Sequence, residues 1–392
     1  MVLGLLTGLV AFAIDISLPA IPVMVHDLAT SMSSGQQVVG LFMAGMALGQ
    51  LPCGLISDRI GRLPVLYAGI GLFTVAGIVT SASDDIGVML IARFVQGVGS
   101  SAGMVLARAI VRDVASGSQA ARLMSVMVMI FTAAPMLAPM FGSLLVTAWG
   151  WRAPFAATTL AGVLILFGIN WSLSETHKPG ERQHVLHQLR ASIGEFVTHR
   201  QSLFGVTIIM VTIVGIMALV SGSSALIIEI YTFPVKYFGF IFALTGLAIL
   251  IGSTINRRLL LRFDAIKMIG VGALLAGIAG VQLLIMALLG QAGFWWLWGN
   301  LCLFMCATGF LLPNATALAL DPVPGIAGVA ASLIGTLQSL AGATSAIVSS
   351  ALYTGTILNV TVVVGGAGIA TLTLFWSREL ILGDAPLHGH AD

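Results

Sequence analysis

Two ionisable side chains stand within long apolar stretches of the sequence. Asp15 lies about 13 residues into the first stretch and Arg93 about seven residues from one end of the fourth, or about 20 Å and 10 Å deep at the helical rise per residue. Such residues are costly in hydrocarbon and usually mark a pathway for ions or substrate. Desolvation favours the neutral form of a carboxyl group, whereas arginine stays charged. We therefore predict that Asp15 carries a proton and that Arg93 stabilises its carboxylate, directly or through Gln96 and water.

Each of these two residues also has a plainer interpretation. Asp15 could lie near the outer interface, capped by the hydroxyl of Ser17. Arg93 could extend its side chain to the outer headgroups. Beyond Gln96, Gly97 is the first of several glycines that permit close helix contact.

A second group of charged residues lies between the second and third apolar stretches. The motif reads Gly54-x3-Asp58-Arg59-x-Gly61-Arg62. Its glycines allow a tight turn, and Asp58 can accept charge-assisted hydrogen bonds. The motif predicts a charged latch at the cytoplasmic face, or alternatively a basic loop with ordinary turn residues.

A related basic cluster follows the fourth stretch. It contains Arg108, Arg112 and Asp113. We expect an ion-pair network there with Asp58 or with the central polar segment, and no transport chemistry.

The fifth stretch contains two prolines, Pro135 and Pro139, followed by Gly142. Proline frees backbone groups and bends a helix. The two prolines are four residues apart and so share one face. They indicate either a helix that flexes or seals, or a passive kink.

Other residues are candidates for an apolar substrate cavity. Aromatic rings and methionine suit a permissive surface, and lone amides in a span either line a cavity or join helices. Glu229 could join substrate or proton binding, or anchor the outer end of its span. The candidates are Phe12, Phe42, Phe131, Met127, Glu229, Asn300 and Gln338. Lipid-facing or core positions are equally open for the phenylalanines.

The composition excludes most soluble classes of protein. Hydrophobic residues make up 58% of the 392 residues and charged ones only 8%, against about 25% charged residues in a soluble domain. So few charged residues cannot cover a water-facing surface, so lipid must surround much of the chain. A nucleic-acid-binding protein or a soluble enzyme is therefore excluded. Cys302 and Cys306 share a helix face, but no histidine or carboxylate joins them, so we predict no metal site.

The apolar stretches predict an all-α integral membrane protein with twelve transmembrane helices. Each stretch approaches the roughly 20 residues that a spanning helix needs. Their limits are 2–24, 36–56, 64–82, 86–108, 122–147, 152–173, 203–228, 238–256, 268–289, 294–318, 326–353 and 358–377.

The distribution of charge fixes the orientation of these spans. Nearly all of the 17 lysines and arginines fall in connections on one side, and only Arg152 and Lys236 fall on the other. Because positive residues stay cytoplasmic, both termini are predicted inside. All seven tryptophans fall near span ends, where an interfacial aromatic belt is expected.

Residues 174–201 form the one long polar segment and divide the spans six and six. We predict an N-terminal bundle over 1–173, a cytoplasmic linker over 174–201 and a C-terminal bundle over 202–392. His184 and His187 have a spacing that metal ligands sometimes show, but an amphipathic linker helix explains them better. Gly252-x3-Asn256-Arg257 repeats the pattern of Gly54-x3-Asp58-Arg59, which suggests duplicated halves.

Together these motifs resemble those of the major facilitator superfamily, and of its twelve-helix drug:proton antiporter group. The resemblance rests on three stretches of the sequence: the Asp58–Arg62 loop, the Leu90-x2-Arg93-x2-Gln96-Gly97 stretch and the proline-bearing fifth span. Asp15-x-x-Leu-Pro-Ala-x-Pro is similar to the first-helix stretch of the Bcr/CflA drug-resistance transporters. Arg108-Ala-x-x-Arg-Asp113 is similar to the stretch that follows their fourth helix.

This resemblance implies a pair of six-helix bundles related by a pseudo-twofold axis. It also implies export of hydrophobic antibiotics, such as bicyclomycin or phenicols, across a bacterial inner membrane in exchange for protons. The proton gradient would supply the energy with no cofactor, and a monomer would suffice. The sequence departs from the antiporter pattern at Ser143, where a second glycine is preferred, and at Asn256, which replaces an acid.

Two other classes of function compete with this one. A proton-coupled uptake symporter for a small metabolite could use the same fold. An intramembrane enzyme is disfavoured, because the seven histidines all lie in loops, at span ends or in the tail. A nucleotide-driven pump would need a phosphate-binding GxxxxGK[ST] motif, which does not occur in the sequence.

Overall fold

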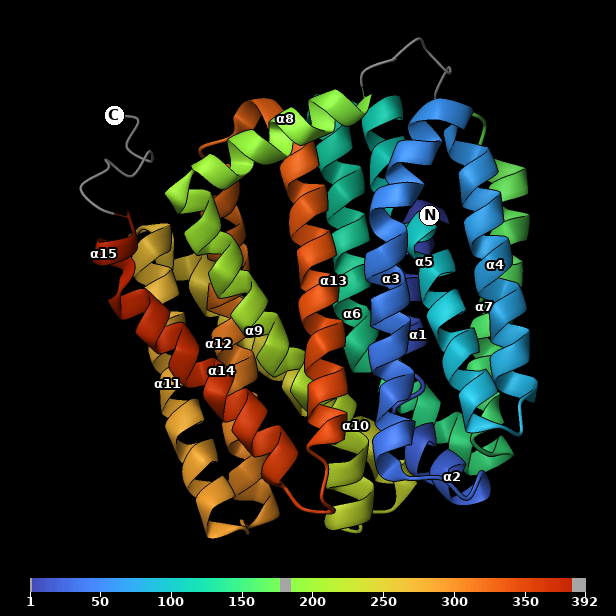
Figure 1. Cartoon of the computed structure of the whole chain (residues 1–392), viewed down its shortest axis with the longest axis vertical. Coiled ribbons are helices and arrows are strands. Elements are labelled where there is room, and N and C mark those ends of the chain that lie inside the picture. Colours follow the sequence, from blue (N-terminus) through green and yellow to red (C-terminus); the bar gives the residue numbers. More distant parts are fainter. Residues whose placement is uncertain (1, 177–184, 383–392) are drawn as a thin grey trace. The chain divides into compact units, whose positions relative to one another are not determined.

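The computed structural model describes residues 2–176 and 185–382, and this part of the chain is built from helices without strands (Figure 1). The α-helices are α1 (Val2–Asp15), α2 (Ala20–Asp27), α3 (Met32–Ile60), α4 (Arg62–Ala82), α5 (Ile86–Val114), α6 (Gly117–Trp149), α7 (Arg152–Ser172), α8 (Val185–Thr198), α9 (Arg200–Ser224), α10 (Val235–Leu259), α11 (Ala265–Leu289), α12 (Phe294–Leu320), α13 (Ala327–Ala351), α14 (Leu358–Trp376) and α15 (Arg378–Leu382). Ala225–Ile230 is a π-helical extension of α9, and Pro324–Ile326 is a 3₁₀ turn.

The predicted number of spans is confirmed over the described residues. Eleven helices are long and apolar enough to cross a membrane, and the count reaches 12 when α1 and α2 are taken as one broken span. Two of the span starts are capped as elementary chemistry requires, because Ser31 accepts from the backbone N–H of Ser34 and Asp85 accepts from that of Val88.

The first span differs from the single run predicted over 2–24. It breaks after Asp15, and α1 and α2 meet at a bend of 53°. Proline has no N–H, so Pro19 cannot make the helical hydrogen bond to the Asp15 carbonyl. The N–H of Leu18 donates to that carbonyl instead, at 3.3 Å, which closes a tighter turn. The predicted acid therefore stands at a helix end.

Five of the seven tryptophans have exposed side chains, and their place in an interfacial belt stays a prediction. Trp149 and Trp171 are 74% and 93% exposed at their helix ends. Trp151 and Trp298 are buried instead. Trp151 donates from Nε1 to Asp27 at 2.9 Å, so its indole N–H is satisfied inside the fold.

The chain forms two compact units. Unit 1 comprises Met1–Gln183 and Ser223–Ala243, and unit 2 comprises His184–Gly222 and Leu244–Asp392. α10 is therefore shared, because its residues up to Ala243 belong to unit 1 and the rest to unit 2. The division into 1–173, 174–201 and 202–392 stays a prediction, and the side chains of His184 and His187 lie outside the described part.

Glycine sets the packing of unit 1 at the contact between α3 and α5. A Cβ at Gly45 would collide with the backbone carbonyl of Phe94, and one at Gly97 would collide with that of Phe42. The two backbones approach so closely that a side chain at either position must displace a helix. Arg93 directly precedes Phe94 on α5, so it lies next to this close contact.

In unit 2, glycines likewise allow two pairs of helices to approach closely. Gly368 of α14 faces the Ala276 carbonyl of α11, and Gly252 of α10 faces the Cys306 carbonyl of α12. At the α10–α12 contact, Asn314 donates from Nδ2 to Asn256 Oδ1 at 2.8 Å, inside the fold.

Candidate proton-coupling site and cytoplasmic ion-pair network

Asp15 is buried, with 5% of its surface exposed, at the C-terminal end of α1. Within the described ranges its carboxylate has no ion-pair partner. Ser17, which could have capped it, instead donates to the Ile14 carbonyl at 2.7 Å. A buried carboxyl group without a counter-ion is costly to ionise, and this position suits an acid that binds and releases a proton.

Arg93 is completely buried, so its side chain does not extend to the lipid headgroups. It donates from Nη1 to Gln96 Oε1 at 2.8 Å, and from Nε and Nη2 to the carbonyls of Val38 and Ala13 at 3.3 Å each. The guanidinium also lies 4.5 Å from the ring centroid of Phe42. The planar fork of arginine thus joins α1 and α3 to α5.

The predicted pairing of Arg93 with Asp15 is not direct in this structure. The guanidinium binds the carbonyl of Ala13, two residues before Asp15. The last carbonyls of a helix lack partners within the helix, and Arg93 satisfies one of them at the end of α1. Gln96 keeps its Nε2 buried with no hydrogen bond to the described residues. A link from Gln96 to Asp15 through water stays a prediction.

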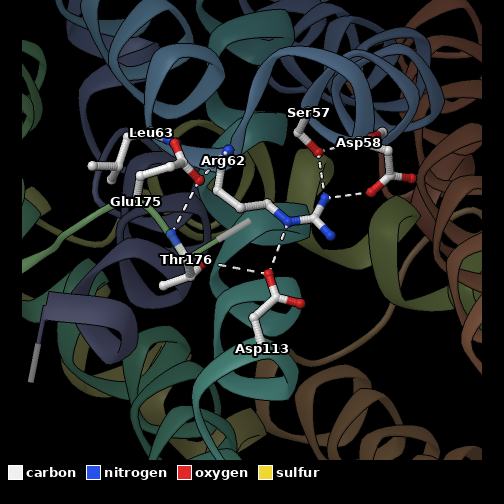
Figure 2. A network of polar contacts seen from close by, with 8 residues as sticks. Ser57, Asp58, Arg62, Leu63, Asp113, Glu175 and Thr176 are labelled. Carbon is white, nitrogen blue, oxygen red and sulfur yellow. Dashed lines mark hydrogen bonds and ion pairs between the residues drawn. The ribbon is translucent and has the colours of Figure 1, made fainter. Parts of the chain in front are cut away.

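The cytoplasmic motif forms an ion-pair network centred on Arg62. Its Nη1 donates to Asp58 Oδ1 at 2.6 Å and to Ser57 Oγ at 2.7 Å, and its Nε donates to Asp113 Oδ2 at 3.0 Å. Figure 2 shows the Arg62 side chain extended between Asp58 and Asp113. The arginine therefore connects the end of α3, the start of α4 and the end of α5.

The other predicted arginines of this region differ from the expectation. Arg59, Arg108 and Arg112 are exposed, and they form no ion pair with the described part of the chain. Asp113 joins the network through Arg62 rather than through its own neighbours. The physical reason is position, because Arg62 follows directly on the turn and its side chain lies between the two helix ends.

Glu175, which follows α7, is a member of this network that the sequence did not single out. Its two carboxylate oxygens accept from the backbone N–H groups of Arg62 and Leu63, at 2.9 and 3.0 Å (Figure 2). It therefore caps the N-terminus of α4 from a position more than 100 residues away in sequence. In the sequence, Glu175 falls within the polar segment 174–201. The sequence does contain a signal for this cap. Glu175 is an acid that directly follows a span, and the turn before α4 offers no capping side chain of its own.

Gly61 makes this cap possible. Its φ of 104° lies where only glycine is relaxed. A Cβ at this position would also lie 2.7 Å from Glu175 Oε2. By contrast, Gly54 has ordinary space, with its nearest neighbour at 3.7 Å. Of the two motif glycines, only Gly61 is required by the local backbone.

The fifth-span motif lies inside α6, which stays one helix through Pro135 and Pro139. Gly142 packs directly against the break after Asp15. A Cβ at Gly142 would collide with the Ile16 carbonyl and lie 3.0 Å from Pro19 Cγ. At Gly142, which has no side chain, the backbone of α6 therefore packs closely against the segment that follows Asp15.

The candidates for the substrate cavity are spread over both units. In unit 1, Phe42 and Met127 are buried, Phe131 is 38% exposed, and Phe12 lies with its ring centroid 6.5 Å from that of Phe141. Glu229 is exposed in the π-helical extension. In unit 2, Asn300 donates to the Trp296 carbonyl at 2.9 Å, and Gln338 is half-buried. Their part in binding substrate stays a prediction.

Comparison with known proteins identifies the family. The sequence profile of the Major Facilitator Superfamily matches residues 3–346. The chain belongs to this family of transporters.

The curated relatives include proteins from three bacteria. The bicyclomycin resistance protein homolog of Haemophilus influenzae is 30% identical over 342 residues, which cover 87% of this chain and 86% of the relative. Multidrug resistance protein D of Escherichia coli is 29% identical, with 90% and 88% covered. The MFS-type transporter YdgK of Bacillus subtilis is 32% identical, with 95% and 94% covered. The predicted resemblance to the Bcr/CflA group is confirmed by these relatives.

Solved structures confirm the fold. The xylose transporter XylE of E. coli, in a partially occluded inward-open conformation, has a TM-score of 0.73 at 15% identity and covers 100% of this chain and 99% of its own. A mutant of the peptide transporter POT, in complex with sulfate, has a TM-score of 0.75 at 14% identity, with 97% of this chain and 94% of the transporter covered. At these identities the likeness concerns the major facilitator fold alone.

Proposed function

We propose that the chain exports small hydrophobic, drug-like molecules in exchange for protons. The observation that carries this proposal is Asp15, a buried carboxyl group without a counter-ion at the break of the first span. Curated relatives named for bicyclomycin and multidrug resistance support the substrate class. No cofactor takes part, and the proton gradient is the energy source.

The mechanism is alternating access with Asp15 as the proton carrier. When neutral, Asp15 tolerates its dry environment, and when ionised it favours a state that admits water or a cation. Arg93 provides a fixed positive charge near the end of α1 through its bond to Ala13. It favours the ionised state of Asp15 without accepting the proton itself. Protonation and substrate binding thereby bias opposite states.

The same proposal places the protein in the bacterial inner membrane with both termini in the cytoplasm. The support is the distribution of basic residues, which gathers Arg59, Arg62 and the arginines near Asp113 on one side. The chain acts as a monomer, since two bundles of spans complete this architecture.

The test is drug-driven proton movement in everted membrane vesicles whose lumen has been acidified. The panel contains phenicols, bicyclomycin and lipophilic cations. A drug that is exchanged for protons releases them from the lumen, and Asp15→Asn should abolish this release. Asp264→Asn is the matched control, because this acid is 59% exposed in a surface ion pair.

Two results would contradict the proposal. If no drug releases protons from vesicles that hold the wild-type chain, drug:proton antiport is wrong, and uptake of a metabolite together with protons becomes the function to test. If Asp15→Asn releases protons as the wild type does, antiport stands and Asp15 is not the carrier.

A further inference from the structure

Ser143 is the residue at which the fifth-span motif departs from the antiporter pattern, and it makes a specific pair of hydrogen bonds. It is 1% exposed. Its Oγ donates to the Pro139 carbonyl at 2.8 Å and accepts from the backbone N–H of Gly239 at 3.0 Å. A glycine at position 143 would make neither bond. Ser143 therefore ties α6 to the first half of α10 within unit 1.

The helices approach backbone to backbone at this point. A Cβ at Gly239 would collide with the backbone of Met140 and lie 2.8 Å from the Pro139 carbonyl. The Ser143 hydroxyl thus stands between a carbonyl of one helix and an N–H of the other, with both of its hydrogen-bonding functions used. Any movement of α10 away from α6 must break the bond to Gly239.

The neighbouring residue contacts the proton site. Gly142 packs against the Ile16 carbonyl, directly after Asp15, as described above. Gly142 and Ser143 are consecutive residues of one helix, so a displacement of the break after Asp15 is passed to Ser143 without a flexible element between them. α10 then continues from unit 1 into unit 2 beyond Ala243.

We propose that Ser143 is a positioning residue that couples the state of Asp15 to α10, acting through its hydrogen bond to the Gly239 backbone. The coupling rests on the proposed function in one respect, namely that Asp15 changes its protonation state. The Pro139–Ser143 stretch is the mechanical connection, with Gly142 against the break and Ser143 against α10.

The test is hydrogen–deuterium exchange of the peptide that covers 235–243, in the purified full-length protein. Loss of one hydrogen bond corresponds to about a two- to tenfold change in an opening equilibrium. Ser143→Ala and Ser143→Gly should raise the exchange rate of this peptide by about this factor. Ser143→Thr keeps the hydroxyl, so its exchange rate should stay close to that of the wild type. Thr371→Val is the control, because this buried hydroxyl bonds to the Ala367 carbonyl of its own helix in unit 2.

The coupling itself is measured by a double-mutant cycle with Asp15→Asn, a permanently neutral mimic of the protonated acid. Asp15→Asn should change the exchange of 235–243 when Ser143 is present, and this change should be lost in Ser143→Ala. An unaltered exchange in Ser143→Ala would overturn the proposal. An effect of Asp15→Asn that is absent, or equally large without Ser143, would overturn it too. No drug is needed, so failure of drug export and failure of the coupling are distinguished.

Discussion

Replacing Glu175 tests the cytoplasmic network at the residue that caps α4. Glu175→Ala leaves the backbone N–H groups of Arg62 and Leu63 without their acceptors. A capping side chain is worth about 0.5–2 kcal/mol. Because the Glu175 carboxylate satisfies two donors from an exposed position, we expect a loss of about 1–2 kcal/mol in the free energy of unfolding. Glu175→Gln should recover only part of it, since its NH₂ group faces one of the two donors.

The assay is thermal unfolding of the purified protein in detergent. A loss of this size lowers Tm by roughly 1–3 °C in a chain of this length. Glu195→Ala serves as the control, because Glu195 is an exposed acid of α8, and its Tm should match that of the wild type. If Glu175→Ala unfolds at the same temperature as Glu195→Ala, the cap does not stabilise α4 and the account of the network is wrong.

Three further substitutions follow from the geometry. Gly97→Ala should prevent close packing of α3 on α5, because its Cβ meets the Phe42 carbonyl. Gly71→Ala is the control, because a Cβ there meets open space and the variant should purify and transport normally. Equal yields of the two purified variants would contradict this. Arg93→Lys keeps the charge but loses the planar fork, so we expect at least a roughly tenfold loss of transport at unchanged expression, and wild-type rates would show that the fork is dispensable. Glu229→Gln separates the two interpretations of this exposed acid: drug-driven proton release stays unchanged if Glu229 only anchors its span, and a loss of release would assign it to substrate or proton binding.

The sequence predicts the architecture well because hydrocarbon imposes strict rules on it. Span length and the side on which arginines fall both follow from the cost of unpaired polar groups. The same rules single out Asp15 and Arg93, which the structure shows to be buried. The break after Asp15 was not predicted, although Pro19, which has no backbone N–H, was visible in the sequence.

The partners of these residues could not be predicted in the same way. Arg93 binds a carbonyl on another helix, and such an acceptor has no signature in the sequence. Glu175 contacts the start of α4 only because α7 ends beside it. Trp151 resembles an interfacial residue until the fold supplies Asp27 as the acceptor for its N–H. Contacts between distant segments therefore had to come from the structure.

The central claim, that Asp15 carries the exchanged proton, is tested most directly by proton release from the purified protein in weakly buffered detergent solution. Addition of a transported drug to the wild type should release protons in a saturable manner, because drug and proton favour opposite states. Asp15→Asn should bind the same drug and release none. Saturable release of equal size from Asp15→Asn would contradict the account.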